Sequence, residues 1–287
     1  MEGSVIGSEP KEEMANPITE DLVQIRDVWN ENLDEEFEMI KSIAEDPKFV
    51  YVAMDTEFPG NVFKRHAFQE TYYEFLKMNV NHTKLIQLGL TFFDEKGNLP
   101  TCGTGKYCVW QFNFREFDEL VDKHACAPES IELLKKHGIK FDEFKEKGVD
   151  IHRFGELLMS SGIVMKDPTR LNQVHWIVFH GSFDFGYVVK LLRGERLPET
   201  QERFLELLET YIPNFYDVKY VIKFTDGLYG GLQDAAIALR VQRIGASHQA
   251  GSDSLLTGLV FMKLKENHST DRIEKYARIL NYLEPTT

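Results

Sequence analysis

Apolar residues fall into two kinds of run along the chain, and each kind predicts a different element. Short apolar runs rich in β-branched and aromatic residues are typical of buried strands. Gly97-Asn98 separates two of these runs, which are therefore expected to form a hairpin. A further run, 215–222, fits either a strand or the start of a helix. The predicted strands are 49–53, 85–93, 107–114 and 175–180.

Between and after these runs, apolar residues recur at helical spacing. From Asp34, for example, Phe37, Ile40 and Ile43 share one face, and acidic residues lie at the start, where the helix dipole favours negative charge. Glycines close several of the later helices. The predicted helices are one beginning near Asp34, then 70–77, 128–137, 141–147, 152–160, 183–193 and 232–240, and a long one beginning near Ser252.

The order of these elements indicates the fold class. Three strands come first and later strands are separated by helices, which is typical of an α/β fold with a mixed sheet and helices packed on both faces. The chain has no internal repeat and no linker rich in Pro, Gly or Ser. We expect residues 1–20 to be a disordered lead and residues 21–287 to form a single domain.

Charge narrows the range of partners. The 287 residues carry a formal net charge of −13, which argues against a broad basic surface for nucleic acid. Residues 1–50 hold fourteen acidic against four basic side chains, so the rest of the chain is nearly neutral. If the substrate is a nucleic acid, affinity therefore depends on a cleft and on recruitment by partners.

Composition sets the expected compartment. Hydrophobic residues make up 43% of the chain, no apolar run approaches the length of a membrane span, and Met1 opens no signal-peptide pattern, so we expect a soluble intracellular protein. Cys102, Cys108 and Cys126 form neither a C-x-x-C pair nor an even set, which predicts free thiols. The glycine-rich loop 103–106 lies between two predicted strands, so a hairpin loop is expected there and not a phosphate cradle.

Two acids, Asp55 and Glu57, come at the end of the first predicted strand, and Pro59-Gly60 stops that strand. Residues at i and i+2 of a strand point to the same side, so two negative charges share one face at the edge of an apolar sheet. Such a pair is costly unless a cation lies between its members. From this stretch alone, an acidic pair facing water and a pair holding a divalent metal remain equally open interpretations.

Two later stretches carry acids in comparable places. Asp184 follows a predicted strand and opens a helix, and Val188 and Leu192 place it on the stripe that should face the sheet. His248 precedes Asp253, which opens the last helix. Each acid alone is explained as a favourable charge at a helix start. All three signals, however, lie where a strand or loop meets an apolar element, which favours a shared site.

These motifs resemble those of a known family. Asp-x-Glu at a strand end, a second Asp after a later strand and His-x-Ala-x-x-Asp near the C-terminus are similar to the DEDD exonucleases with a catalytic histidine. Over about 23–265 the chain resembles the CAF-type poly(A) deadenylases, nuclease subunits of the CCR–NOT complex, and stretch 97–103 is most similar to their plant members. The stretches that carry the resemblance are VAMDTEFPG (52–60), LIQLGLTF (85–92), WQFNF (110–114), ELLMSSG (156–162), 185–187 and HQAGSDSLLT (248–257).

The resemblance implies a ribonuclease H-like fold and a 3′-to-5′ exoribonuclease that shortens mRNA poly(A) tails to 5′-AMP. By resemblance, Asp55, Glu57, Asp184 and Asp253 hold two divalent ions, Mg²⁺ or Mn²⁺, with His248 beside them. It also implies a monomeric subunit of a hetero-complex with the CCR–NOT scaffold and the second deadenylase, no membrane, and a place in cytoplasm and nucleus.

The chemistry suits these residue types independently of the family. Two Mg²⁺ ions activate an attacking water and neutralise a leaving oxygen, and Mg²⁺ prefers oxygen ligands. A histidine accepts a proton near neutral pH, so His248 is assigned as general base. Phe58, Phe183 and Phe185 are candidates for stacking on bases or, equally, core residues.

Two rival functions remain. One is a DEDD exonuclease acting on other RNA or DNA 3′ ends. The other is a non-catalytic adaptor of a deadenylase complex, which a missing ligand would indicate. None of the five residues is missing.

Overall fold

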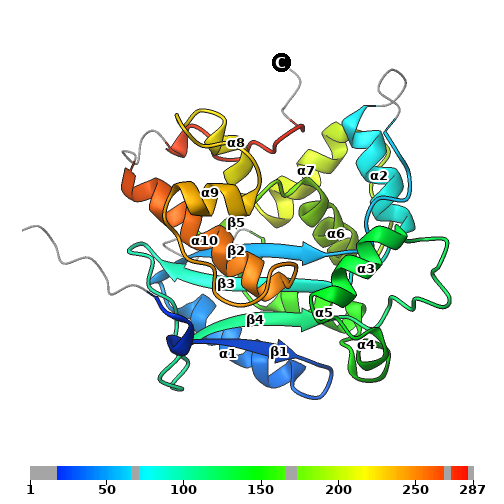
Figure 1. Ribbon diagram of the computed structural model, residues 1–287, viewed down its shortest axis with the longest axis horizontal. Coiled ribbons are helices and arrows are strands. Elements are labelled where there is room, and N and C mark those ends of the chain that lie inside the picture. Colours follow the sequence, from blue (N-terminus) through cyan, green and yellow to red (C-terminus); the bar gives the residue numbers. More distant parts are fainter. Residues whose placement is uncertain (1–17, 66–70, 166–172, 268–272, 284–287) are drawn as a thin grey trace, which may run out of the picture.

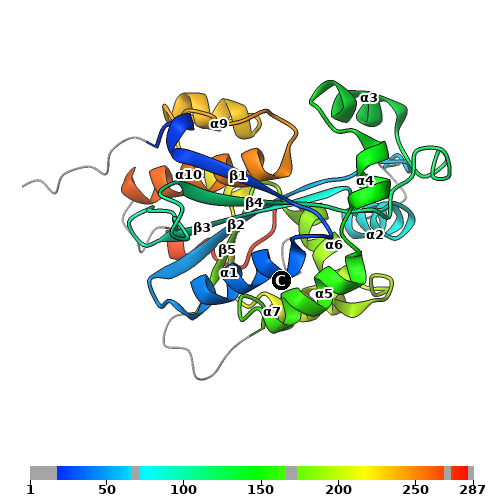
Figure 2. The same ribbon diagram turned by 90° about the horizontal axis from the view of Figure 1, so that it is seen from below.

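A six-stranded sheet between two layers of helices forms the body of the protein (Figures 1 and 2). The computed structural model describes residues 18–65, 71–165, 173–267 and 273–283. Of the expected disordered lead, 1–20, residues 1–17 lie outside the described residues. No helix in these ranges combines the length and the apolar character needed to cross a membrane.

The sheet is mixed, as the order of elements predicted. In spatial order the strands are β1 (Val23–Val28), β4 (Tyr107–Asn113), β3 (Gln87–Asp94), β2 (Phe49–Glu57), β5 (His175–Val178) and β6 (Phe215–Asp217). The centre of the sheet is antiparallel, since β3 pairs with β2 on one side and with β4 on the other. The outer pairs β1–β4, β2–β5 and β5–β6 are parallel.

The apolar runs in the sequence predicted every strand of the sheet except β1. Runs 49–53, 85–93, 107–114 and 175–180 correspond to β2, β3, β4 and β5, and the hairpin between β3 and β4 is confirmed. The run 215–222, which fitted either a strand or a helix start, forms one of each, because β6 passes directly into α8 (Val218–Ile222).

The expectation that the first strand begins at residue 49 is wrong. β1 lies at the edge of the sheet, and only Val23 and Val28 of its six side chains are buried. Gln24, Arg26 and Asp27 interrupt its apolar pattern, and an edge strand needs fewer buried residues than a central one.

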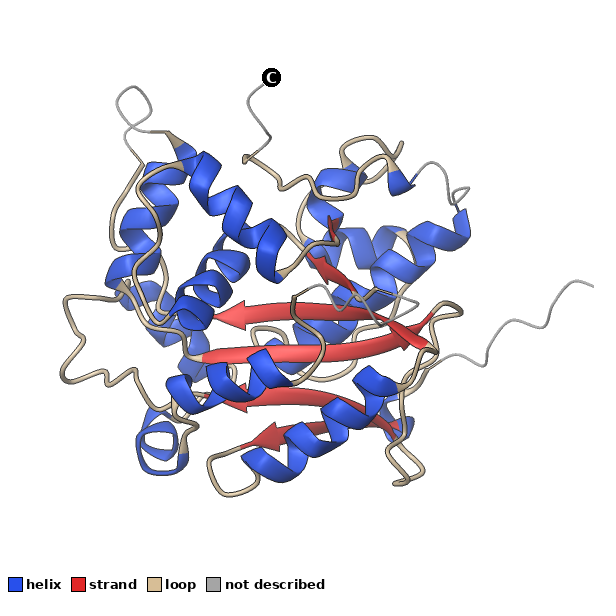
Figure 3. Ribbon diagram, turned by 180° about the vertical axis from the view of Figure 1, so that it is seen from behind, coloured by secondary structure: helices blue, strands red, loops and turns tan. Residues whose placement is uncertain are grey.

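Helices cover both faces of the sheet, as predicted. On one face lie α1 (Leu33–Glu45), α2 (Tyr72–His82), α5 (Ile151–Ser160), α6 (Ser182–Arg193) and α7 (Gln201–Tyr211) (Figure 3). On the other lie α8, α9 (Leu232–Ala238) and α10 (Ala250–Asn267). α3 (Pro128–Lys136) and α4 (Phe141–Lys147) pack at one end with Ile86 and Phe117.

One helix is longer than predicted. α2 continues past residue 77 to His82, because Leu76 and Val80 extend its buried face into the core. Thr71 and Glu74 start it with a capping box, in which each side chain bonds to the backbone of the other residue.

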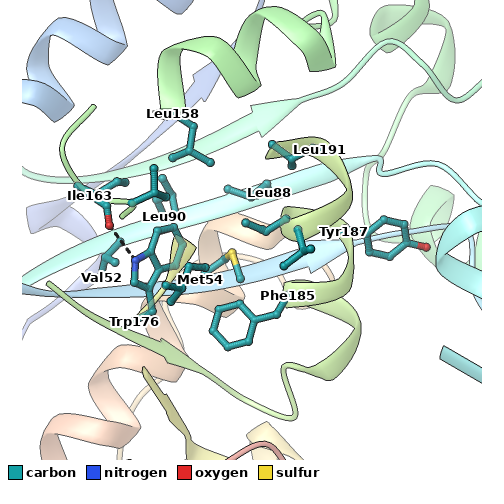
Figure 4. Packing of buried hydrophobic residues seen from close by; sticks show 14 of the residues in the cluster. Val52, Met54, Leu88, Leu90, Leu158, Ile163, Trp176, Phe185, Tyr187 and Leu191 are labelled. Atoms are coloured by element: carbon teal, nitrogen blue, oxygen red, sulfur yellow. Dashed lines mark hydrogen bonds between the residues drawn. The ribbon is translucent and has the colours of Figure 1, made fainter. Parts of the chain in front are cut away.

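The larger apolar core fills the space between the sheet and α6. Met54 and Trp176 come from β2 and β5, and Phe185 packs against them from the first turns of α6 (Figure 4). The indole of Trp176 donates a hydrogen bond of 3.0 Å to the carbonyl of Ile163, which satisfies the one polar atom of a fully buried ring. This packing fixes α6, and with it Asp184, against the sheet.

The other face holds α10 unusually close to the strands. A Cβ on Gly89 of β3 would lie 1.9 Å from the carbonyl oxygen of Ala250, and one on Gly258 would lie 2.1 Å from the ring of Phe93. Real Cβ atoms do not approach other atoms so closely, so glycine is required at both positions for this packing. The first turn of α10 therefore lies directly over the acid-bearing end of the sheet.

Candidate active site

The acids Asp55 and Glu57 lie on the face of the sheet that α10 covers. They follow Ala53 in alternation, and Ala53 packs in the core beneath α10. Met54 packs in the opposite core, so Thr56 faces the α6 side by the same alternation. β2 is central in the sheet, which places both acids between the starts of α6 and α10.

Asp184 reaches the site from the start of α6. Its side chain is 8% exposed, and its Oδ1 accepts a hydrogen bond of 2.7 Å from the hydroxyl of Thr56. The turn before the helix is held by Asp217 at the end of β6, whose buried carboxylate accepts from the backbone N–H of His180. Asp184 thus occupies the position that follows a parallel strand, as the sequence predicted.

The start of α10 is held by side chains that rise from the sheet. The N–H of Ala250 donates to Oε1 of Gln87, and the N–H of Gly251 donates to Oε1 of Gln111. These two glutamines, from β3 and β4, pair with N–H groups that have no partner within the helix.

Two partners, a backbone N–H and a guanidinium, contact the carboxylate of Asp253. Oδ2 accepts from the backbone N–H of His248 at 2.9 Å, and Oδ1 forms an ion pair with Arg243. The guanidinium of Arg243 also donates to Ser252 and Gln233, so it is fixed against the wall of the cleft. Arg243 is the cation next to the acids in the part of the chain that the structure describes.

Three potential ligand atoms converge at the centre. Glu57, His248 and Asp253 each offer one atom, and these atoms lie within 4.8 Å of one another. The cleft that they face has a volume of about 550 Å³. It is lined by Asp55, Thr56, Glu57, Phe179, Gly231, Leu232, Gln233, Arg243, Ser247, His248 and Asp253.

Burial and mutual repulsion make this cluster costly in its ionised form. Burial raises the pKa of Glu57 to about 8 and the pKa of Asp184 to about 7. The pKa of Asp55 rises well above its ordinary value, first by burial and then by the charges of the neighbouring carboxylates, while Arg243 acts in the opposite direction. A divalent cation would remove this repulsion, so the donor set fits a metal centre made of hard oxygen ligands.

His248 lies beside the acids in a strained backbone conformation. Its φ is +58°, which is uncommon for a residue other than glycine and recurs at functional sites. The ring contacts that of His137 edge to face, with centroids 4.7 Å apart. Burial lowers the pKa of His248, which favours the neutral imidazole that can accept a proton.

The structure therefore brings all five residues named from the sequence to one place. Four residues that hold them there were not predicted from the sequence: Thr56, Gln87, Gln111 and Arg243. The available signal for the glutamines was a polar residue inside an apolar strand, as in Leu-Ile-Gln-Leu and Trp-Gln-Phe.

Of the three candidate stacking residues, one is a core residue. Phe185 is fully buried and packs edge to face on Phe215 with ring centroids 5.1 Å apart, so it cannot meet a base. Phe58 and Phe183 are half-buried and stack on each other with centroids 5.4 Å apart.

Comparison with known proteins places the chain in a family. The family model of the CAF1 family ribonucleases matches residues 28–153, which include Asp55 and Glu57. The Arabidopsis thaliana protein named probable CCR4-associated factor 1 homolog 7 is 52% identical over 270 residues, which are 92% of this chain and 94% of that protein. The chain belongs to the CAF1 ribonuclease family.

More distant relatives support the same family assignment. The poly(A) ribonuclease pop2 of Schizosaccharomyces pombe is 41% identical over 93% of this chain and 76% of that protein. A structure of S. pombe Pop2p in its Mg²⁺- and Mn²⁺-bound form superposes with a TM-score of 0.80 at 40% identity, covering 90% of this chain and 99% of that one. The structure of the yeast NOT1 MIF4G domain co-crystallised with CAF1 gives a TM-score of 0.74 at 29% identity, and the match covers 93% of this chain and 100% of that one.

Proposed function

We infer that this chain is a 3′-to-5′ exoribonuclease that shortens the poly(A) tails of mRNA by hydrolysis and so promotes mRNA turnover. The observation that carries the inference is that Asp55, Glu57, Asp253 and His248 line one cleft, although they come from separate parts of the chain. Asp184 joins them through its hydrogen bond with Thr56, which lines the same cleft. The relative named poly(A) ribonuclease, at 41% identity, gives the substrate. A non-catalytic adaptor has no need of this costly arrangement.

Asp55, Glu57, Asp184 and Asp253 are the ligands we propose for two divalent cations. The support is the clustered donor set and the Mg²⁺- and Mn²⁺-bound form of Pop2p. When bound, such ions activate water and neutralise a leaving 3′-oxygen. The chain itself holds the carboxylates in place: Thr56 orients Asp184, and the N–H of His248 with Arg243 orients Asp253.

His248 is the general base in this proposal. Its ring lies within reach of the same point as Glu57 and Asp253, and a ring nitrogen takes the proton from the attacking water. The contact with His137 restricts the ring, and the N–H bond to Asp253 restricts the backbone. Release of 5′-AMP follows from attack at the last phosphodiester bond of the strand.

We further propose that residues 21–287 act as one catalytic domain and as a monomeric subunit of the CCR–NOT complex, together with its scaffold and the second deadenylase. The support is the co-crystallisation of yeast CAF1 with NOT1, since the chain spans the whole of that CAF1 molecule. The cytoplasm and the nucleus are the proposed compartments, which a fluorescent fusion expressed at native level tests.

The experiment for the function is a titration of Mg²⁺ and of Mn²⁺ on 5′-labelled oligo(A), beside mixed-sequence RNA and DNA of the same length. We expect stepwise shortening of oligo(A) that requires the cation and is lost in Asp55→Asn. Glu45→Gln, at the end of α1, is the matched control and should cleave like the wild type. Cleavage by Asp55→Asn at the wild-type rate would overturn the site, and equal cleavage of DNA would overturn the substrate.

A further inference from the structure

Exposed aromatic rings gather on one loop beside the cleft. Among the large hydrophobic side chains that the described residues expose most, four are aromatic. Two of these, Phe224 at 56% and Tyr229 at 80%, lie on the loop between α8 and α9, and Tyr282 at 55% lies near α8. The fourth, Phe63, is only 37% exposed. Since exposed rings cost hydration free energy, their concentration at one place indicates a binding surface.

This loop is continuous with the wall of the cleft. Gly231 and Leu232, which follow Tyr229 by two and three residues, line the cleft beside Asp55 and Glu57. Figure 1 shows α8 and α9 together on the face that carries α10.

A lysine ties the loop to that wall. The Nζ of Lys219 donates to the carbonyl of Gly230 and lies 5.8 Å from the ring centroid of Phe179, which itself lines the cleft. The aromatic loop and the acids are thus parts of one surface.

Positive charge accompanies these rings. Lys223 lies over the rings of Tyr220 and Tyr282, with its Nζ 5.1 Å and 5.4 Å from their centroids. Phe224 stacks on Tyr276, with centroids 5.0 Å apart and planes 10° from parallel. Of the two rings beside Lys223, Tyr282 is exposed and Tyr220 is half-buried. In a chain whose net charge is −13, a lysine next to exposed aromatic rings is suited to a phosphate backbone with unstacked bases.

We propose that residues 219–231, with Tyr276 and Tyr282, form a track that binds the nucleotides upstream of the 3′ end, with Tyr229 stacking on a base next to the cleft. The proposal rests on the proposed function, because it assigns the path of the same RNA substrate. Lys219 and Lys223 contact phosphates, and Phe224 extends the track away from the catalytic residues. Single-stranded RNA is chosen over a protein partner because the surface continues into a cleft whose substrate is a strand end.

The test compares Tyr229→Ala and Tyr229→Phe with the wild type on oligo(A) of about 4 and about 20 nucleotides, which bracket the usual length of single-strand sites. A short substrate occupies the cleft alone, whereas a long one also covers the track. We expect the preference in kcat/KM for the long substrate to fall about fivefold or more in Tyr229→Ala, the low end for loss of one stacked base. Tyr229→Phe keeps the ring and retains the preference.

Direct binding gives a second readout. Fluorescence anisotropy measures the affinity of the Asp55→Asn variant for labelled oligo(A), which this variant does not degrade. We expect this affinity to fall by a similar factor when Tyr229→Ala is added. Leu120→Ala is the control, since Leu120 is equally exposed, at 83%, on a different loop. An unchanged preference and unchanged anisotropy would overturn the track and leave the surface to a protein partner. Failure of the proposed function is recognised separately, because the wild type would then not shorten either substrate.

Discussion

Two helices bring acids to the cleft, and they are held there by different means. α6 follows β5 in a strand–helix unit, and its preceding turn is held by backbone bonds to Asp217 at the end of the neighbouring strand. α10 follows a long loop, and its first turn is held by Gln87 and Gln111, which rise from the face of the sheet. The first helix is positioned by its connection to β5 and by a contact at the end of the neighbouring strand, and the second by contacts with side chains on the face of the sheet.

The acids themselves differ in the same way. Asp184 is held by a neutral hydroxyl, Thr56, whereas Asp253 is held by the cationic Arg243. A hydrogen bond from a neutral hydroxyl offsets part of the cost of a buried carboxylate, and a cation also compensates its charge. Among the described residues, the acid on the α6 side is held by a hydroxyl and the acid on the α10 side by a guanidinium, so each side can be tested separately.

The largest effect is expected on the α10 side. His248→Ala removes the proposed base, so kcat should fall by about 10²–10⁴-fold while the carboxylates still bind cations. Single-turnover cleavage of oligo(A) with saturating Mg²⁺ measures the loss, and calorimetry with Mn²⁺ checks that binding persists. His137→Ala removes the neighbour that restricts the ring of His248 but keeps the base itself, so its loss of kcat should be much smaller. A near-normal kcat in His248→Ala with cations bound would show that His248 is not the general base.

The α6 side is examined by Thr56→Val, which keeps the shape of the side chain but removes the hydroxyl that orients Asp184. Apparent affinity for Mg²⁺ should fall about 10–100-fold, the usual cost of removing a group that holds a metal ligand. The half-saturating Mg²⁺ concentration for cleavage is the measurement. Thr91→Val, which removes a buried hydroxyl that bonds Ser254, should leave that concentration unchanged. Equal Mg²⁺ dependence in the two variants would show that Thr56 does not position Asp184.

Close packing of α10 gives a third test. Gly89→Ala places a Cβ against the carbonyl of Ala250 and should lower the free energy of unfolding by about 1–3 kcal/mol. It should also lower the activity of the molecules that remain folded, because the first turn of α10 is displaced. Gly258→Ala strains the same helix against Phe93, farther along from the acids, so it should cost stability with a smaller loss of activity. Urea unfolding and cleavage of each variant separate the two effects. If both variants lose activity alike, the first turn is not what aligns Asp253.

The smallest effect is on stability as a function of pH. The pKa values of Glu57 and Asp184, raised to about 8 and about 7, mean that the protonated carboxyls stabilise the metal-free fold. This contribution is complete below the unfolded pKa of about 4 and is lost as pH rises through about 7 to 8.

Thermal unfolding checks that sign. The Tm of the metal-free protein should therefore fall as pH rises towards 8, and Mg²⁺ should raise Tm by more at pH 8 than at pH 6. Glu57→Gln should flatten both trends. A Tm that rises over this range in the wild type and equally in Glu57→Gln would contradict the expected direction.

The comparison also explains what could be predicted from the sequence. Asp55, Glu57 and Asp184 each lie at the end of an apolar strand or the start of the helix after it. Each signal alone has a simpler explanation, and only their shared placement favours a common site. The strand β1 was missed because an edge strand needs little apolar surface. Asp253 opens the last helix, so the same local pattern placed it and His248 in the shared site. The family resemblance added the assignment of the four acids as ligands of two cations, with His248 beside them.

The residues that support the site could not be predicted because their roles depend on contacts across the chain. Thr56 and Asp184 are separated by 128 positions, and Gln87 and Ala250 by 163. Arg243 lies in a loop, where an arginine is usually a solvated charge, and only the fold brings it to Asp253.

The central claim is that acids from β2, α6 and α10 together hold divalent cations. Anomalous diffraction from crystals of this protein soaked in Mn²⁺ tests it most directly. We expect manganese peaks within coordination distance of Asp55, Glu57, Asp184 and Asp253, and their loss in Asp55→Asn. A fully occupied Mn²⁺ elsewhere with no peak among these four carboxylates, or peaks that persist unchanged in Asp55→Asn, would contradict it.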